Sequence, residues 1–190
     1  MKWLALFLVL PAAEALAHTD GAAAGFASGF LHPLSGLDHV VAMIAVGLWG
    51  AQLRAPAIWA LPVAFPMMMA LGGLLGILGV PLLGVEIGIA VSAVALGALV
   101  AFEARWPLAA AMAIVAVFAI FHGHAHGAEL APGTSAVAYS LGFVIATGML
   151  HAVGILIGLA QMLPGGRYAL RGAGALVGCA GLLFLTRVFV

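Results

Sequence analysis

Six long apolar runs dominate this sequence and restrict what it can fold into. Each is close to the roughly 20 residues that an α-helix needs to cross a bilayer at about 1.5 Å per residue. Since 66% of the residues are hydrophobic and only 6% are charged, the chain has too few charges to cover a water-facing surface. The sequence therefore predicts an all-α, polytopic membrane helix bundle with six transmembrane helices at about 36–53, 57–79, 86–102, 107–121, 137–162 and 168–189.

The N-terminus is a separate unit. Lys2 precedes an apolar run that is too short to span a bilayer, and residues 15–17, Ala-Leu-Ala, have the small-x-small pattern of a signal-peptidase site. We predict that 1–17 is a cleavable signal peptide, with an uncleaved extra helix as the alternative, and that 18–190 is a single six-helix transmembrane transport domain. Cleavage would leave His18 with a free amine beside its imidazole, two nitrogens able to bind one metal ion.

The basic residues indicate an orientation. Arg54, Arg105, Arg167 and Arg171 follow odd-numbered spans and fall on one side, whereas Arg187 falls on the other. The signal peptide independently places the mature N-terminus outside. We therefore predict a multi-pass protein of the bacterial inner membrane with both mature termini on the periplasmic side. Six basic and six acidic residues leave no net charge to attract nucleic acid.

Glycines recur at four-residue spacing in three of the runs, within 72–76, 154–158 and 174–178. Small residues at that spacing let helix backbones approach closely in lipid. The pattern predicts a tightly packed bundle, and a homo-oligomer is compatible with it.

Polar residues open the first span in the stretch HPLSGLDH, residues 32–39. Pro33 suits the first helical position, where its missing N–H costs nothing. This interpretation places His32 just outside the helix and puts Asp38 and His39 in its second turn. The predicted topology puts all three side chains at the outer face of the membrane.

A second polar stretch, FHGHAHGAE at 121–129, ends the fourth span at the same face. His122, His126 and Glu129 stand at i, i+4 and i+7, which is one helical face if the helix continues through the two glycines. His124 would then point away from that face.

These groups have the chemistry of a metal site, and Glu86 at the start of the third span lies at the same face. Imidazole and carboxylate donors without thiolate suit a borderline divalent cation such as Ni²⁺, Co²⁺ or Zn²⁺. Ionisable groups inside a membrane are costly and usually mark an ion path. The predicted metal site consists of His32, Asp38, His39, Glu86, His122, His126 and Glu129.

His151 stands apart from both stretches, about 14 residues into the fifth run and so near mid-membrane. It is either a second station on the route inward or a neutral histidine bonded between helices. Together with His18 and His124, it is a further candidate for the transport pathway.

Taken together, the two stretches resemble the signature motifs of the HupE/UreJ family of bacterial nickel, and sometimes cobalt, permeases. The likeness extends to a cleavable signal, six spans, an acidic residue opening the third span and a Phe-Pro pair in the second. It implies a metal-ion transporter rather than an enzyme, with Ni²⁺ or Co²⁺ as transported substrate and no prosthetic group. It also implies a transport role for Phe65 and, at the other matching positions, for His32, Asp38, His39, Glu86, His122, His126 and Glu129.

Two other functions remain open from the residues alone. A membrane-embedded zinc-dependent hydrolase could hold zinc on the histidines and Asp38, near Ser35, and activate water. A metal-binding membrane protein would bind the ion without moving it. A hydrolase would retain tightly bound zinc through purification, whereas a permease would bind weakly and move the ion across a sealed membrane.

Overall fold

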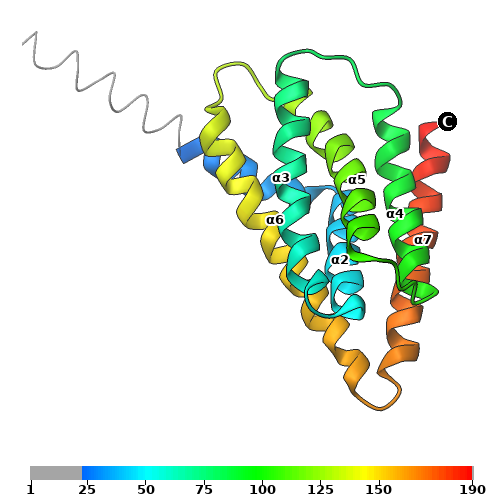
Figure 1. Ribbon diagram of the computed structural model, residues 1–190. Helices are drawn as coiled ribbons and strands as arrows, with labels where there is room; N and C mark the ends of the chain where they lie inside the picture. Colours follow the sequence, from blue (N-terminus) through cyan, green and yellow to red (C-terminus); the bar gives the residue numbers. More distant parts are fainter. Residues whose placement is uncertain (1–22, 190) are drawn as a thin grey trace, which may run out of the picture.

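The computed structural model describes residues 23–189, and within that range the chain is helical and contains no strand. The helix Ala23–Ser35 comes first. It is followed by α2 (Leu37–Leu53), α3 (Ala57–Ile77), α4 (Val85–Ala101), α5 (Leu108–Ala128), α6 (Ala136–Leu159), the short 3₁₀ helix η1 (Ala160–Met162) and α7 (Gly166–Val188). Figure 1 shows α2 to α7 running up and down between two ends of one bundle. The predicted all-α fold is confirmed, while the predicted signal peptide and His18 lie outside the described residues.

Four helical segments are long and apolar enough to cross a membrane: α3, α5, α6 continued by η1, and α7. The helix Ala23–Ser35 and α2 qualify together as a fifth, although the pair is bent by 81°. The remaining helix, α4, is apolar but has 17 residues. The membrane helix bundle expected from the apolar runs is confirmed, and the count of six spans stays a prediction.

The bend before α2 changes where the first polar stretch lies. Gly36, in an extended conformation with φ −96° and ψ 114°, separates the two helices. The prediction that His32 precedes the helix was wrong, because His32 and Pro33 lie in the last turn of Ala23–Ser35. Asp38 occupies the first turn of α2 rather than the second. The two parts of the motif therefore belong to different helices that meet at a sharp angle.

Packing against α6 explains this additional helix. Phe26 and Phe30 stack one turn apart, with ring centroids separated by 6.4 Å. Gly29 lies so close to the backbone of Tyr139 that no side chain would fit, and Gly142 of α6 meets the backbone of Phe26 in the same way. Because these contacts join distant parts of the sequence, apolar run length alone does not reveal them.

α5 also extends beyond the predicted end at residue 121 and reaches Ala128. Gly123 and Gly127 lie in its last two turns, where each meets the backbone of α3 without room for a side chain. This close packing keeps the polar stretch helical. The condition for placing His122 and His126 on one helical face is thereby met.

The bundle is built from three closely packed helix pairs: α3 with α5, α4 with α7, and α2 with α6. A side chain added at Gly72 or Gly76 would collide with α5, one at Gly154 with α2, and one at Gly174 with α4. The prediction that the regularly spaced glycines serve helix packing is confirmed.

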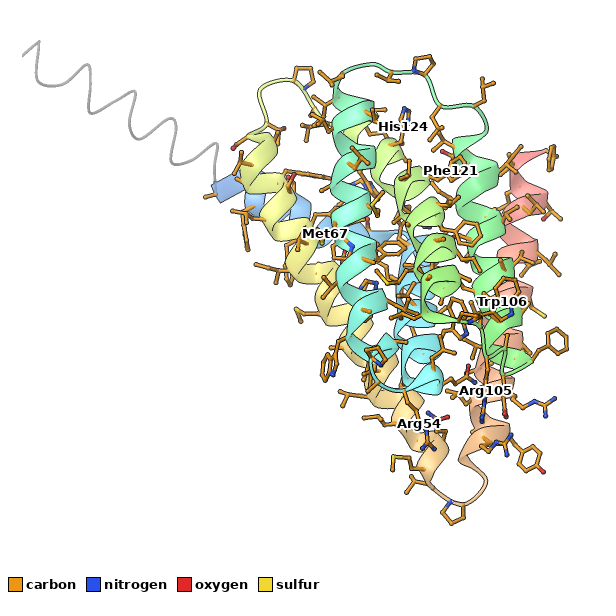
Figure 2. The ribbon with its side chains drawn as sticks, viewed as in Figure 1. Arg54, Met67, Arg105, Trp106, Phe121 and His124 are labelled. Atoms are coloured by element: carbon orange, nitrogen blue, oxygen red, sulfur yellow. The ribbon has the colours of Figure 1, made fainter. Side chains whose placement is uncertain are left out.

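The charged residues separate toward the two ends of the bundle. Arg54, Arg105 and Arg167 line one cavity of about 150 Å³, and this part of the molecule is called the basic end. Arg187 lies at the opposite end, which also contains His124. In Figure 2, Arg54 and Arg105 are at the bottom of the view and His124 is at the top. The predicted grouping of arginines is confirmed, and which end faces the periplasm remains a prediction.

Side chains tie the helices together at the basic end. Trp49 donates a hydrogen bond of 2.9 Å to the Ala104 carbonyl, and Gln161 donates one of 2.8 Å to the Ala51 carbonyl. Arg167 forms an ion pair with Glu103, and its hydrogen bonds lower the pKa of that carboxyl. These contacts join the α4–α5 connection to α2 and α7, and η1 to α2.

Candidate metal site

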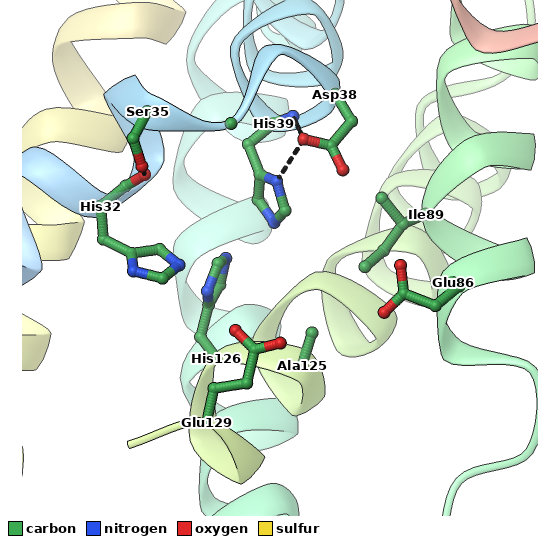
Figure 3. A pocket seen from close by; sticks show the side chains of 10 residues that line it. His32, Ser35, Asp38, His39, Glu86, Ile89, Ala125, His126 and Glu129 are labelled. Atoms are coloured by element: carbon green, nitrogen blue, oxygen red, sulfur yellow. Dashed lines mark hydrogen bonds and ion pairs between the residues drawn. The ribbon is translucent and has the colours of Figure 1, made fainter. Parts of the chain in front are cut away.

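A cavity of about 190 Å³ lies between the helix Ala23–Ser35, α2, α4 and α5, at the end of the bundle opposite the basic end. It is called the histidine cavity here. Figure 3 shows side chains from all four segments pointing into it. The structure brings together all but one of the predicted metal-site residues, namely His32, Asp38, His39, Glu86, His126 and Glu129.

Three of these side chains are arranged to share one ion. Ligand atoms of His32, His126 and Glu129 all lie within 4.8 Å of one another, and the two imidazole rings are edge to face with centroids 4.5 Å apart. Donors bound to one ion at about 2.1 Å each are separated by at most about 4.2 Å. A shift of less than about 1 Å would therefore bring all three onto the same ion.

His39 approaches the same position from α2. Its ring centroid is 4.4 Å from that of His126. Its Nδ1 is 2.9 Å from Oδ1 of Asp38, drawn as a dashed line in Figure 3. With Nδ1 donating to the carboxylate, Nε2 keeps a lone pair, and this buried Nε2 has no partner among the described residues. Asp38 thus orients His39 in the way that carboxylates orient metal-binding histidines.

His126 is the most deeply placed donor in the cavity, with 5% of its surface exposed. Neither ring nitrogen has a hydrogen-bond partner in the described part of the chain. Buried polar atoms are almost always satisfied, so an unpartnered imidazole in a polar cavity indicates a ligand position. The carboxyl groups of Asp38, Glu86 and Glu129 around the cavity favour a cation as that ligand.

His122 lies deeper in the bundle and does not line the histidine cavity. It is fully buried, and its Nε2 is 2.9 Å from the hydroxyl of Ser92. The Ser92 hydroxyl donates its single hydrogen to the Ile89 carbonyl, so Nε2 must be the donor to Ser92 and Nδ1 keeps the lone pair. The ring of His122 is 4.8 Å from that of His39. His122 is therefore positioned one layer behind the cavity.

The remaining transport candidates in the described residues, His124, Phe65 and His151, do not line the histidine cavity. His124 points away from the cavity, as its spacing predicts, and its Nε2 is 2.7 Å from the Val80 carbonyl, to which it donates. This bond connects α5 to the α3–α4 connection, while the buried Nδ1 of His124 has no partner among the described residues. Phe65 and His151 are both buried inside the bundle, farther from the cavity.

Sequence reasoning missed Ser92, which fixes the tautomer of His122. Its signal was present, because Ser92 and Glu86 are the two polar residues of α4. A lone hydroxyl in an apolar helix is easily satisfied by its own backbone, however, and only the structure shows that it also bonds a histidine of another helix.

The comparison with known proteins agrees with the two motifs. The family model described as HupE / UreJ protein matches residues 6–184. The chain belongs to the HupE/UreJ family. It is also 44% identical, over 178 residues, to Protein HupE of Rhizobium leguminosarum bv. viciae, an alignment that covers 94% of this chain and 93% of that protein. No solved structure matches the chain.

The residues matched by the family model include all the elements that build the histidine cavity, from the helix Ala23–Ser35 to the end of α5. The resemblance drawn from HPLSGLDH and FHGHAHGAE is thereby confirmed.

Proposed function

We propose that this member of the HupE/UreJ family is a secondary permease that takes up a divalent transition-metal ion, Ni²⁺ or Co²⁺, through the histidine cavity. The observation that carries the proposal is the meeting of imidazole and carboxylate donors from four helical segments at one end of a bundle of membrane-length helices. Family membership supports the same function. The periplasm is the proposed source of the ion, and the inner membrane is the proposed location.

Capture begins with electrostatic attraction: the carboxylates of Asp38, Glu86 and Glu129 give the cavity negative charge, which attracts a hydrated cation. His32, His126 and Glu129 then replace part of the water shell, because their donor atoms are already within 4.8 Å of one another. The ring of His39 is oriented by the bond between its Nδ1 and Asp38, and its Nε2 is available as a further donor. Nitrogen and oxygen donors suit Ni²⁺ and Co²⁺.

The membrane potential supplies enough driving force without a nucleotide. A potential of about 100 mV, negative inside, favours entry of a doubly charged ion by roughly 4.6 kcal/mol, which is twice the single-charge value. This free energy corresponds to about three decades of accumulation. The sequence contains no GxxxxGK[ST] phosphate-binding motif.

Metal flux into proteoliposomes tests the proposal. Purified protein is reconstituted, and uptake of Ni²⁺, Co²⁺ and Zn²⁺ is followed with and without an inside-negative potential, for the wild type, Asp38→Ala and the control His124→Gln. We expect potential-driven uptake of Ni²⁺ or Co²⁺ that falls at least about tenfold in Asp38→Ala, in line with the usual cost of losing a carboxylate that orients a metal-binding histidine. The control should keep its flux, since His124 points away from the cavity and bonds the Val80 carbonyl.

The same experiment separates the alternatives. Tightly retained zinc together with no flux would favour a zinc hydrolase, and weak binding with no flux would favour a metal-binding protein that does not transport. Flux that Asp38→Ala leaves unchanged would remove the first motif from the pathway.

A further inference from the structure

His151 is a buried polar side chain that the histidine cavity does not use. It lies in α6 with 1% of its surface exposed, and neither ring nitrogen has a hydrogen-bond partner among the described residues. His124 differs, because one of its ring nitrogens, Nε2, is bonded to the Val80 carbonyl and only Nδ1 is unpartnered. A structural histidine between helices would be expected to form such a bond, since an unpaired buried polar group costs about 1–3 kcal/mol.

Thr147 provides a second unpartnered polar group at the same place. It precedes His151 by one helical turn, so both side chains lie on the same face of α6. Thr147 is fully buried, and its hydroxyl oxygen also lacks a hydrogen-bond partner. An imidazole and a hydroxyl one turn apart therefore face the interior of the bundle without internal bonds.

A backbone carbonyl of α3 completes this group. The Pro62 carbonyl lies near the ring of His151, although the two do not meet the geometry of a hydrogen bond. Within α3 this carbonyl would normally accept from residue 66, which is a proline and has no N–H. Carbonyls released in this way coordinate ions where a membrane helix lines a cavity or pathway.

Phe65 separates these groups from the histidine cavity. It is fully buried, and its ring centroid is 5.7 Å from that of His122 and 5.3 Å from that of His151. His122 in turn lies 4.8 Å from His39 at the cavity wall. The rings thus form a continuous series from the cavity toward mid-bundle, with a single aromatic side chain between two imidazoles.

From this arrangement we infer that His151, the Thr147 hydroxyl and the Pro62 carbonyl form a second, inner station for the transported divalent cation, reached from the histidine cavity past Phe65. This inference rests on the proposed transport function. The inner station has one nitrogen and two neutral oxygen donors and no carboxylate, so it holds the cation more weakly than the outer cavity does. Weak binding there suits release toward the basic end.

The test separates flux from capture. His151→Leu is compared with wild type and with His124→Gln, and each protein is assayed for Ni²⁺ flux in proteoliposomes and for equilibrium Ni²⁺ binding in detergent. We expect His151→Leu to lose at least about tenfold in flux while its tightest Ni²⁺ affinity stays within about twofold of wild type. Flux of His151→Leu within about twofold of wild type would overturn the inner station. Absence of wild-type flux would instead contradict the proposed function itself.

A second variant with a spectroscopic signal tests the inner station independently of whether His151→Leu folds. His151→Cys is prepared in a Cys179→Ser background, so that the introduced thiol is the single cysteine of the chain. With Co²⁺ present, a thiolate ligand gives a sulfur-to-cobalt charge-transfer band in the near ultraviolet. We expect this band in His151→Cys at saturating Co²⁺ and not in His151→Ser. Its absence in folded His151→Cys would overturn the inner station.

Discussion

The substitution Gly123→Ala tests whether the packing of α5 against α3 is as close as the structure shows. A Cβ at Gly123 would collide with the backbone of Met69, whose carbonyl oxygen and carbon have no flexible side chain to move aside. The two helices would have to separate. Overpacking of this kind costs about 1–3 kcal/mol, and a backbone collision belongs at the upper end of that range.

The intrinsic preference of a helix for alanine over glycine offsets about 1 kcal/mol of that cost. The expected net loss is therefore about 2 kcal/mol in the free energy of unfolding. Gly148→Ala is a matched control, because Gly148 lies inside α6 and a Cβ there meets nothing within 4 Å. That variant should gain up to about 1 kcal/mol, so the two variants should differ by about 3 kcal/mol.

Equilibrium unfolding of the purified protein in detergent measures this difference. Because Gly123 lies between His122 and His126 on the same helix, the separation of α5 from α3 should also weaken nickel binding. The packing argument would be refuted if Gly123→Ala were as stable as Gly148→Ala.

Three further predictions concern single side chains. Glu129→Gln removes the exposed carboxylate of the three-residue group and should weaken Ni²⁺ binding at least about tenfold by isothermal titration calorimetry; unchanged affinity would exclude Glu129 as a ligand. Ser92→Ala leaves the Nε2–H of buried His122 without an acceptor and should cost about 1–3 kcal/mol in detergent unfolding, an expectation that a fully stable variant would contradict. Trp49→Phe loses the hydrogen bond to the Ala104 carbonyl and should cost about 1 kcal/mol, whereas Trp59→Phe, at a position 67% exposed, should cost nothing comparable.

Much of the fold could be predicted because lipid imposes a simple rule on sequence. Apolar length alone located α3 and α7 to within a few residues. The helical repeat also separated His126, which enters the cavity, from His124, which does not. The candidate metal site could be predicted for a related reason. Ionisable groups in membrane helices are energetically costly and usually functional, so the few carboxylates of this chain mark a candidate site.

The parts that could not be predicted depend on contacts between distant residues. The helix Ala23–Ser35 is formed by packing of Gly29 against Tyr139 and of Phe26 against Gly142. Pro33 is compatible with the start of one helix or the last turn of another, and only these contacts decide between them. The inner groups also depend on such contacts: Pro66 indicates from the sequence that the Pro62 carbonyl lacks its helical donor, but only the structure brings that carbonyl and the Thr147 hydroxyl near His151.

X-ray absorption at the metal edge of Ni²⁺-loaded protein tests the central claim most directly, because it reports the atoms bound to the ion. Wild-type protein should show a first shell of nitrogen and oxygen with the multiple-scattering signature of at least two imidazoles, and His126→Ala should lose one of them. A shell of water oxygens alone, or an imidazole signature unchanged by His126→Ala, would contradict the account.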